Sequence, residues 1–357
     1  MEKNMKKLIF ALLFAFSTVA AFAYDYREVI FGNDFKKIKE SSDKAALNFF
    51  LSQKSIKNAI YGDIKSARLF EEKYENGTIY RLLTSYETLS DENLAKWFET
   101  KNILLQTVFI KINGGYRSVS AQDIYHLHCG DGTVRSWEED NYGGVSVLSR
   151  NNRIVGLLEF NNAERVVEGF DEESGKSSTS TERKTSGVLY DWKDLLNEAF
   201  YRTIEGDDFL RLDAWRSDIP KIPIYYSYPL IEKSRPFKYT IQNAFDGNPA
   251  TSYVENTEDN KFEISISAGS QCKKIKIING YAQSESLYKS NNRIQSIYGT
   301  ETGKVSNLKD DTLKPQVLDW AEFGFSVKEI FKGQKYNDTC VAELDFLCED
   351  GSWLFGE

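Results

Sequence analysis

The short segment Asp246-Gly247-Asn248, followed by Thr251, carries side chains that are well suited to holding a metal ion. Their carboxylate, amide and hydroxyl oxygens are hard ligands of the kind that Ca²⁺ prefers, and the glycine permits a tight turn. The same residues also form a good Asx turn between strands without any metal, because Asp-Gly-Asn-Pro favours turns unaided. Both interpretations stay open at this point.

Two further segments, 279–293 and 335–338, are rich in planar polar side chains and tyrosines. Sugar-binding sites use amide, carboxylate and guanidinium groups to bind hydroxyls, and aromatic rings to stack against the apolar face of the sugar. Each side chain also has an alternative role, since buried Asn, Arg and Tyr pin long loops to a sheet by hydrogen bonds. The candidate residues are Asn279, Tyr281, Tyr288, Asn291, Asn292, Arg293, Tyr336 and Asp338.

The sequence signals for a catalytic site are weaker than those for binding. His126 and His128 are the only histidines and lie beside Cys129, but a closed zinc site needs a fourth ligand, and the sequence has no second His/Cys cluster. The chain has no Gly-x-Ser-x-Gly elbow. The acidic run 138–140 could supply the paired carboxylates of a glycosidase, although a solvated turn is the simpler interpretation. We therefore favour a non-catalytic protein.

The N-terminus has the features of a secretory signal peptide, residues 1–23. Basic residues precede an apolar run from Leu8 to Ala23 that ends in small residues. A membrane-spanning helix needs about 20 apolar residues, and charged residues follow this run at once. We expect cleavage after Ala23, no transmembrane segment, and a secreted or periplasmic protein of bacterial type.

The composition supports folded cores and argues against two classes of partner. Hydrophobic residues make up 41% of the chain and aromatic residues 14%, while the formal net charge is −8. Because no basic block offsets it, this charge opposes binding to nucleic acid or to anionic lipid. Aromatic richness in an acidic exported protein suits contact with carbohydrate, and it suits a β-sheet core equally well.

Four cysteines, Cys129, Cys272, Cys340 and Cys348, remain after the expected cleavage, and an even number in an exported chain permits disulfides. A continuous strand over 340–348 would separate the two thiols that it carries by about 26 Å, which excludes a bond between them. The pairing otherwise stays open. Cys340 shares its strand face with apolar residues, which favours a buried thiol.

The pattern of residues 24–220 predicts an α+β domain of unknown role. Ser41-Ser42-Asp43 is typical of a helix start, and a second short helix is expected after Ser90. Apolar residues spaced by three and four over 192–200 predict a further amphipathic helix.

Strands are expected in the same region. Residues 103–112 predict a strand that ends at a glycine turn, and 145–148 with 154–160 predict a hairpin. A second hairpin is expected over 122–137. The Ser/Thr-rich, charged segment 171–187 is expected to be a mobile loop.

Pro220 and Pro223 mark the expected boundary to a second domain, residues 221–357. Apolar and polar residues alternate there, as in 262–267, and Gly, Asn and Asp turns separate short runs. This pattern predicts a β-sandwich or jelly roll.

Three segments of the second domain, 243–247, 279–281 and 335–340, resemble the NADase-type glycan-binding domain, which is a discoidin-like sandwich of the coagulation-factor type C fold. The segments occur in the family's order and spacing, within about residues 222–353. The sequence departs from the family at Tyr253, where tryptophan is usual, and at Ala342, where serine is common. In some bacterial secreted toxins this domain precedes a catalytic NAD glycohydrolase. Since the sequence ends shortly after the domain, we expect glycan recognition without NAD cleavage.

The resemblance also implies site residues. Related sugar-binding modules of this fold often hold one structural Ca²⁺ with such a turn and a late glutamate, which implies the ligands Asp246, Asn248, Thr251 and Glu343. The implied glycan-binding residues are Asn279, Tyr281, Tyr288, Asn291, Arg293, Tyr336 and Asp338.

The sequence as a whole predicts an exported α+β N-terminal domain followed by an all-β discoidin-like jelly-roll sandwich that binds a glycan or cell-surface polysaccharide. Two alternatives stay open. One is a secreted polysaccharide-acting hydrolase that uses the sandwich as a targeting module. The other is an envelope scaffold whose sandwich loops bind a partner protein.

Overall fold

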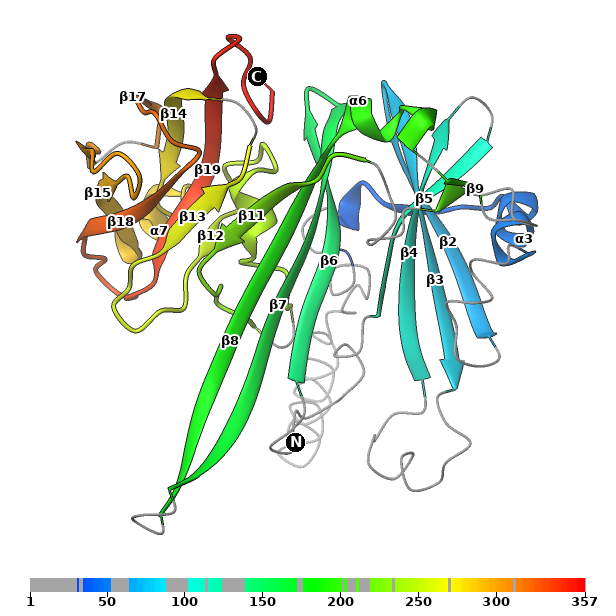
Figure 1. The fold of residues 1–357 in the computed structure, drawn as a ribbon, viewed down its shortest axis with the longest axis horizontal. Coiled ribbons are helices and arrows are strands. Elements are labelled where there is room, and N and C mark those ends of the chain that lie inside the picture. The colour runs from blue at the N-terminus through cyan, green and yellow to red at the C-terminus, as the bar shows by residue number, and fades with distance from the viewer. Residues whose placement is uncertain are drawn as a thin grey trace, which may run out of the picture.

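The computed structural model consists of two large β-sheets and a few short helices (Figure 1). The expected signal peptide and the segment 124–138, which holds His126, His128, Cys129 and Glu138, lie outside the described residues. None of the helices in the described part has the length and apolar character that crossing a bilayer requires. The residues described are 31, 35–52, 64–87, 102–112, 115–123, 139–171, 176–200, 202–203, 210–211, 219–232, 235–268, 271–310 and 313–356.

The first sheet is built from the N-terminal part of the described chain. Neighbouring strands β2 to β5 are antiparallel, whereas β10 runs parallel to β5. The strand predicted over 103–112 is confirmed as β4. In spatial order the strands are β1 (Lys39–Glu40), β2 (Ile64–Tyr74), β3 (Gly77–Glu87), β4 (Asn102–Ile112), β5 (Gly115–Asp123), β10 (Leu210–Arg211) and β9 (Arg202–Thr203).

Helix α3 (Lys44–Ser52) packs on this sheet and begins where the sequence predicts. The Asp43 carboxylate accepts a hydrogen bond of 2.9 Å from the backbone N–H of Ala46, which satisfies a donor of the first turn. Phe50 of the helix stacks on Phe109 of β4, with 4.5 Å between ring centroids. The helix expected after Ser90 lies outside the described residues.

The prediction of a single helix over 192–200 is wrong in its length. It is divided into α6 (Trp192–Leu195) and the 3₁₀ turn η2 (Glu198–Phe200). Trp192 and Leu195 are buried, but Leu196 is exposed, so a single turn already buries the apolar side chains that the pattern relies on. The α+β prediction for residues 24–220 is accordingly not confirmed, because sheets dominate the described part of this region and its helices are short.

The second sheet runs through both parts of the chain (Figure 1). Two short strands lie off its main path: β12 (Tyr253–Val254) pairs with β19, and β16 (Val305–Asn307) pairs with β15. In spatial order the main strands are β17 (Gln316–Asp319), β14 (Cys272–Asn279), β19 (Thr339–Cys348), β15 (Asn292–Tyr298), β18 (Gly324–Phe331), β13 (Glu263–Ile266), β11 (Ile222–Tyr226), β8 (Lys176–Asp191), β7 (Arg153–Asp171) and β6 (Glu139–Arg150).

The hairpin predicted around Asn151-Asn152 is confirmed as β6–β7. Arg150 and Arg153 pair directly, and the two asparagines between them have φ values of 49° and 60°. A two-residue turn with positive φ at both positions matches the twist of the flanking strands, and asparagine tolerates this conformation.

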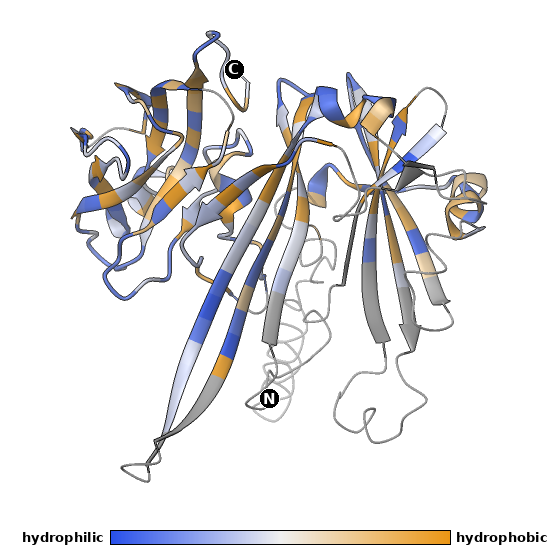
Figure 2. Ribbon diagram, viewed as in Figure 1, coloured by the Kyte–Doolittle hydropathy of each residue, from blue (hydrophilic) through white to orange (hydrophobic). Residues whose placement is uncertain are grey.

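The loop expected over 171–187 is wrong, because β8 pairs with β7 in unbroken register from Lys176 to Asp191. Threonine favours strands, and charged pairs across the ribbon, such as Arg165–Glu182 at 2.6 Å, add support. This part of β8 is exposed and hydrophilic, so its sequence lacks the apolar alternation that marks a half-buried strand (Figure 2).

Strands β6 to β8 form a layer between two hydrophobic cores. Val145, Val147 and Leu157 pack with residues of the first sheet. Leu158 and Phe160, with other side chains of the same strands, pack with the C-terminal sandwich. The two halves of the chain are therefore joined by this central layer.

The C-terminal part confirms the predicted all-β sandwich. Its strands alternate as expected, for example in β13, where Ile264 and Ile266 are buried whereas Glu263 and Ser265 are exposed. Helices are confined there to α7 (Glu285–Ser290) and the 3₁₀ turn η3 (Ile241–Ala244) within the described residues. Cys340 and Cys348 both lie on the continuous strand β19, and Cys272 lies opposite Cys348 in the β14–β19 register.

Candidate functional site

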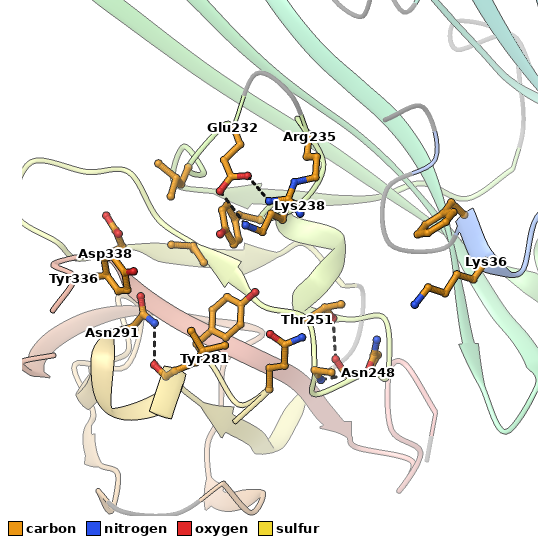
Figure 3. A pocket seen from close by; sticks show the side chains of 17 residues that line it. Lys36, Glu232, Arg235, Lys238, Asn248, Thr251, Tyr281, Asn291, Tyr336 and Asp338 are labelled. Carbon is orange, nitrogen blue, oxygen red and sulfur yellow. Dashed lines mark hydrogen bonds and ion pairs between the residues drawn. The ribbon is translucent and has the colours of Figure 1, made fainter. Parts of the chain in front are cut away.

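A pocket of about 810 Å³ lies where connections of the C-terminal sandwich meet (Figure 3). Side chains from four segments line it, namely 230–239, 248–254, 281–291 and 336–338. Phe35 and Lys36 from the N-terminal part of the chain form a further piece of wall. The pocket thus combines segments that are far apart in the sequence.

Backbone geometry directs the segment 281–291 toward the pocket. Gly280 has a φ of +71°, and a Cβ there would lie 2.8 Å from a side-chain carbon of Arg293 and 2.9 Å from the ring of Tyr288. Only glycine fits this turn, which leads from β14 into α7. Ser284 then caps the helix by accepting a hydrogen bond from Leu287 N, at 3.2 Å.

Tyrosine rings supply the apolar surface of the pocket. Tyr239 and Tyr281 pack edge to face, with 6.2 Å between their centroids. The residue Tyr336 is 41% exposed, and Lys335 Nζ lies 4.8 Å from its ring centroid. An exposed ring of this kind offers a face on which a flat apolar surface can stack.

One end of the pocket carries a charged cluster. A single carboxylate, that of Glu232, accepts from Lys238 Nζ at 2.9 Å and from Arg235 Nη2 at 3.1 Å. Burial alone would raise the pKa of Glu232, but the hydrogen bonds from Lys238 and Tyr239 and the charge of Arg235 outweigh it and hold this pKa below its usual range. Glu232 is therefore ionised at neutral pH and is shared by two cations.

The other end carries Asp338 beside Tyr336 (Figure 3). Burial raises the pKa of Asp338. Asn291 also lines this end, and its Nδ2 donates to Leu287 O at 2.8 Å, which fixes the amide at the C-terminus of α7. The two ends of the pocket thus differ in charge.

The structure brings four of the seven predicted glycan-binding residues together in this pocket. They are Tyr281, Asn291, Tyr336 and Asp338.

The remaining three, Asn279, Tyr288 and Arg293, are buried inside the domain and do not line the pocket. Asn279 bonds both backbone groups of Ile294, at 2.7 and 2.9 Å, and so ties β14 to β15. Asn292, which the sequence also offered, donates to Asn337 O and accepts from Gly333 N at 2.8 Å.

Arg293 and Tyr288 belong to a second internal group. Two nitrogens of Arg293 bond the two carboxylate oxygens of Asp310, at 2.8 and 2.9 Å. The guanidinium also lies 5.2 Å from the ring centroid of Tyr288, whose hydroxyl bonds Asp310 at 3.2 Å. These polar groups are engaged in holding α7 against the sheet.

The turn 246–251 gathers the oxygen atoms that were expected to hold a metal. Thr251 Oγ1 lies 2.7 Å from Asp246 Oδ2 and 2.7 Å from the carbonyl oxygen of Asn248. Glu343, from β19, lies close enough to Asp246 to affect its pKa, and Glu343 Oε1 is buried without a hydrogen-bond partner. Hard oxygens and an unsatisfied buried carboxyl oxygen fit a Ca²⁺ ion. The Asn248 amide oxygen instead accepts from Ala250 N, at 3.2 Å.

The two carboxyl groups lie in an environment that disfavours ionisation. Burial and the nearby Asp246 raise the pKa of Glu343 to about 9, and burial raises that of Asp246 to about 6. Arg150, at the end of β6, places Nη2 3.7 Å from Glu343 Oε2. Within the described residues, no group of three or more His, Cys, Asp or Glu side chains converges as a metal site would, so Ca²⁺ here would depend on two carboxyls and neutral oxygens.

Sequence reasoning missed the charged end of the pocket. The run 232–238 contains Glu232, Arg235 and Lys238, and this density of charge just before a turn motif was a usable signal. Phe35 and Lys36 gave no such signal, because their place in the pocket depends on how the central layer joins distant parts of the chain.

The C-terminal part of the chain is thus a β-sandwich with a polar, tyrosine-bearing pocket among its loops. Residues 222–347 match the family described as the NAD glycohydrolase translocation F5/8 type C domain. The resemblance inferred from the sequence is thereby confirmed for the C-terminal third of the chain. The chain matches no curated protein and no solved structure.

Proposed function

We propose that the C-terminal domain binds a glycan in the pocket between segments 230–239, 281–291 and 336–338. The observation that carries this proposal is that the exposed ring of Tyr336, the amide of Asn291 and the carboxylate of Asp338 line one pocket of about 810 Å³. Discoidin-like domains often bind carbohydrate, and the match over residues 222–347 supports this class of ligand.

Binding would combine stacking with hydrogen bonds. The Tyr336 ring would pack against the apolar face of a sugar, and the amide and carboxylate groups of Asn291 and Asp338 would bind its hydroxyls. Tyr281 is held by its edge-to-face contact with Tyr239, so its position requires little ordering when the ligand binds. The role is non-catalytic.

A structural Ca²⁺ in the turn 246–251 is part of this proposal. Asp246, Thr251, the carbonyl of Asn248 and Glu343 would hold it, and the ion would fix the turn whose residues Asn248, Ala250 and Thr251 line the pocket.

We further propose that the chain is exported and that residues 221–357 form the glycan-binding domain. The apolar run ending at Ala23 supports export, as does the word translocation in the description of the matching family. Secretion with cleavage after Ala23, read by N-terminal sequencing of the exported protein, tests this part independently of the ligand.

The glycan proposal is tested on a glycan array with the full mature chain. Tyr336→Ala should lower binding about 5- to 30-fold, because stacking on one ring is worth about 1–2 kcal/mol. Tyr225→Ala is the matched control, since Tyr225 is 59% exposed and lies outside the pocket. A folded wild-type protein that binds no glycan, or an equal loss in both variants, would refute the proposal.

A further inference from the structure

Two cysteines lie directly opposite each other on neighbouring strands of the C-terminal sandwich. Cys272, the first residue of β14, pairs with Cys348, the last residue of β19, in an antiparallel register (Figure 1). The Cα atoms of such a pair lie about 4.5–5.5 Å apart, which is within the range that a disulfide spans. Both cysteines carry thiols. The backbone therefore brings the two residues to bonding range without any rearrangement of the strands.

A bulge in β14 turns the two thiols to the same face of the sheet. The register shifts by one residue between Cys272 and Lys274, so Lys273 is the extra residue. Lys273 and Lys274 are both exposed, whereas Cys272 is buried with Ile275 on the core side. Without the bulge, strict alternation would place Lys273 on the core face and Cys272 on the solvent face. The bulge thus directs the Cys272 side chain toward Cys348.

Lys273 itself holds the bulge. Its carbonyl accepts a hydrogen bond from Trp320 N at 3.0 Å, and its Nζ donates to Glu349 O at 2.6 Å. Glu349 follows Cys348 in the chain, so the second contact ties the start of β14 to the end of β19 beside the two thiols. These contacts keep the cysteines opposite each other before any bond joins them.

The two cysteines belong to the hydrophobic core of the sandwich, where Cys272 is 5% and Cys348 7% exposed. Burial and, to a smaller extent, the nearby Cys348 raise the pKa of Cys272 to about 12, although the hydrogen bond that its Sγ donates to Lys274 O, at 3.3 Å, opposes this rise. Because the thiolate is the reacting species, the thiol of the folded domain reacts slowly. A bond would therefore form as the chain folds and would then be protected from reductants.

We propose that Cys272 and Cys348 form a disulfide that fixes this end of the sandwich. The proposed export supplies an oxidising setting in which disulfides persist. This inference goes beyond the glycan function and does not depend on it.

The oxidant is a disulfide compound, such as oxidised glutathione or an exported thiol–disulfide oxidoreductase. The thiolate of one cysteine attacks the oxidant's disulfide, which forms a mixed disulfide and releases one thiol. The thiolate of the other cysteine then attacks the protein sulfur of the mixed disulfide and releases the second thiol. The two cysteines lose two electrons and two protons, and the oxidant gains them as two thiols.

The bond would close a loop of roughly 75 residues, between the start of β14 and the end of β19. That loop contains β15, β18 and the segments 281–291 and 336–338, which line the pocket. Closing a long loop restricts the unfolded chain far more than the folded one. We therefore expect the disulfide to stabilise the sandwich without contacting the ligand.

Disulfide mapping of the full mature chain tests the pairing. The protein is unfolded in urea, refolded with a mixture of reduced and oxidised glutathione, and alkylated in denaturant to block the remaining thiols. We expect mass spectrometry of a non-reduced digest to show a cross-linked peptide pair that joins Cys272 to Cys348. Recovery of both as alkylated thiols, or a bond from either one to Cys129 or Cys340, would overturn the proposal. Because glutathione replaces the cell's oxidant, the result does not depend on export.

Thermal unfolding measures the effect of the bond. Wild type refolded with glutathione should have a Tm about 5–15 °C above that of wild type refolded with dithiothreitol. The difference should vanish in Cys272→Ala. It should persist in Cys340→Ala, the matched control, which removes a buried thiol of the same strand outside the pair. Because each variant is compared with itself, the cost of the substitution cancels. An equal Tm for wild type under both conditions, or a difference that survives in Cys272→Ala, would overturn the stabilising role.

Discussion

Asn279 and Asn291 show at the residue scale how one side chain type serves two purposes in one segment. Asn279 is fully buried and bonds both backbone groups of Ile294, so its polar atoms are used within the sheet. Asn291 ends α7 and lines the pocket. Spacing alone cannot separate these roles, because both residues lie near strand ends in a motif rich in Asn and Tyr.

Asn279→Ala should therefore reduce stability without affecting the ligand site. The change leaves the N–H and C=O of Ile294 buried without partners, and we expect the free energy of unfolding to fall by about 1–3 kcal/mol. Urea denaturation measures this loss, and glycan binding of the folded variant should equal that of wild type. Asn291→Ala is the counterpart and should weaken binding. A stable Asn279→Ala variant that fails to bind would place Asn279 in the ligand site.

Glu255 provides a second residue-scale prediction, on pH. Its buried carboxylate accepts from Thr339 N at 3.0 Å and from both the backbone and the hydroxyl of Thr257, at 2.5 and 2.6 Å. Burial raises the pKa of Glu255 above 4.5, and these hydrogen bonds offset only part of that rise.

The sign of the pH effect follows from linkage. From about pH 4.5 upward, the unfolded chain releases the Glu255 proton before the folded chain does, so rising pH favours unfolding until the folded pKa is passed. Glu255→Gln does not titrate. Its free energy of unfolding, relative to wild type, should therefore increase between pH 4 and pH 7 in a series of denaturation curves. Parallel pH profiles for the two proteins would contradict this assignment.

At the scale of elements, the turn 246–251 connects the pocket to the interior of the sandwich. Asp246 orders the turn through Asn248 N, at 2.8 Å, and through the hydroxyl of Thr251. Glu343 of β19 lies beside this turn and forms an ion pair with Arg150 of β6. One turn thus contacts a strand of the sandwich and the central layer.

We expect Ca²⁺ to stabilise this turn. A ligand that binds only the folded state adds about 2.7 kcal/mol at a hundred times its dissociation constant, so millimolar Ca²⁺ should raise Tm by several degrees over EDTA. Glu343→Gln should abolish the increase, whereas Glu349→Gln, at an exposed position beyond β19, should retain it. Mg²⁺ should act more weakly, because it requires a stricter octahedron of ligands. Identical Tm values for wild type in Ca²⁺ and EDTA would refute the proposed ion.

The elements differ in how well their residues predict them. The strand β13 and the Asn151-Asn152 hairpin can be predicted from local sequence. Alternating apolar and polar residues indicate the strand, and two asparagines that tolerate positive φ indicate the turn. β8 does not follow from local chemistry, because the half that begins at Lys176 is polar on both faces and is stabilised by pairing with β7. The pocket residues also differ in how predictable they are. The tyrosines lie in recognisable sequence motifs, whereas Lys36 lines the pocket only because the tertiary structure brings the N-terminal part of the chain next to it.

At the scale of the whole molecule, one sheet crosses from the N-terminal part to the sandwich at the β8–β11 junction. Ile222, Pro223 and Ile224 pair with Leu189, Val188 and Gly187. Side chains of β6 to β8 fill two cores on opposite faces. Because Phe35 and Lys36 belong to the N-terminal part, this junction also determines whether the pocket has its complete wall.

Gly187→Val tests the junction in the full chain. A Cβ at Gly187 would lie 3.3 Å from Ile224 Cβ and 3.3 Å from Ile224 O, so a branched side chain must push β8 and β11 apart. We expect a loss of about 1–3 kcal/mol in the free energy of unfolding, as is usual for overpacking. Ser180→Val, at an exposed position of the same strand, is the control and should change stability by less than about 0.5 kcal/mol. Wild-type stability in Gly187→Val would mean that β8 and β11 do not pair in solution.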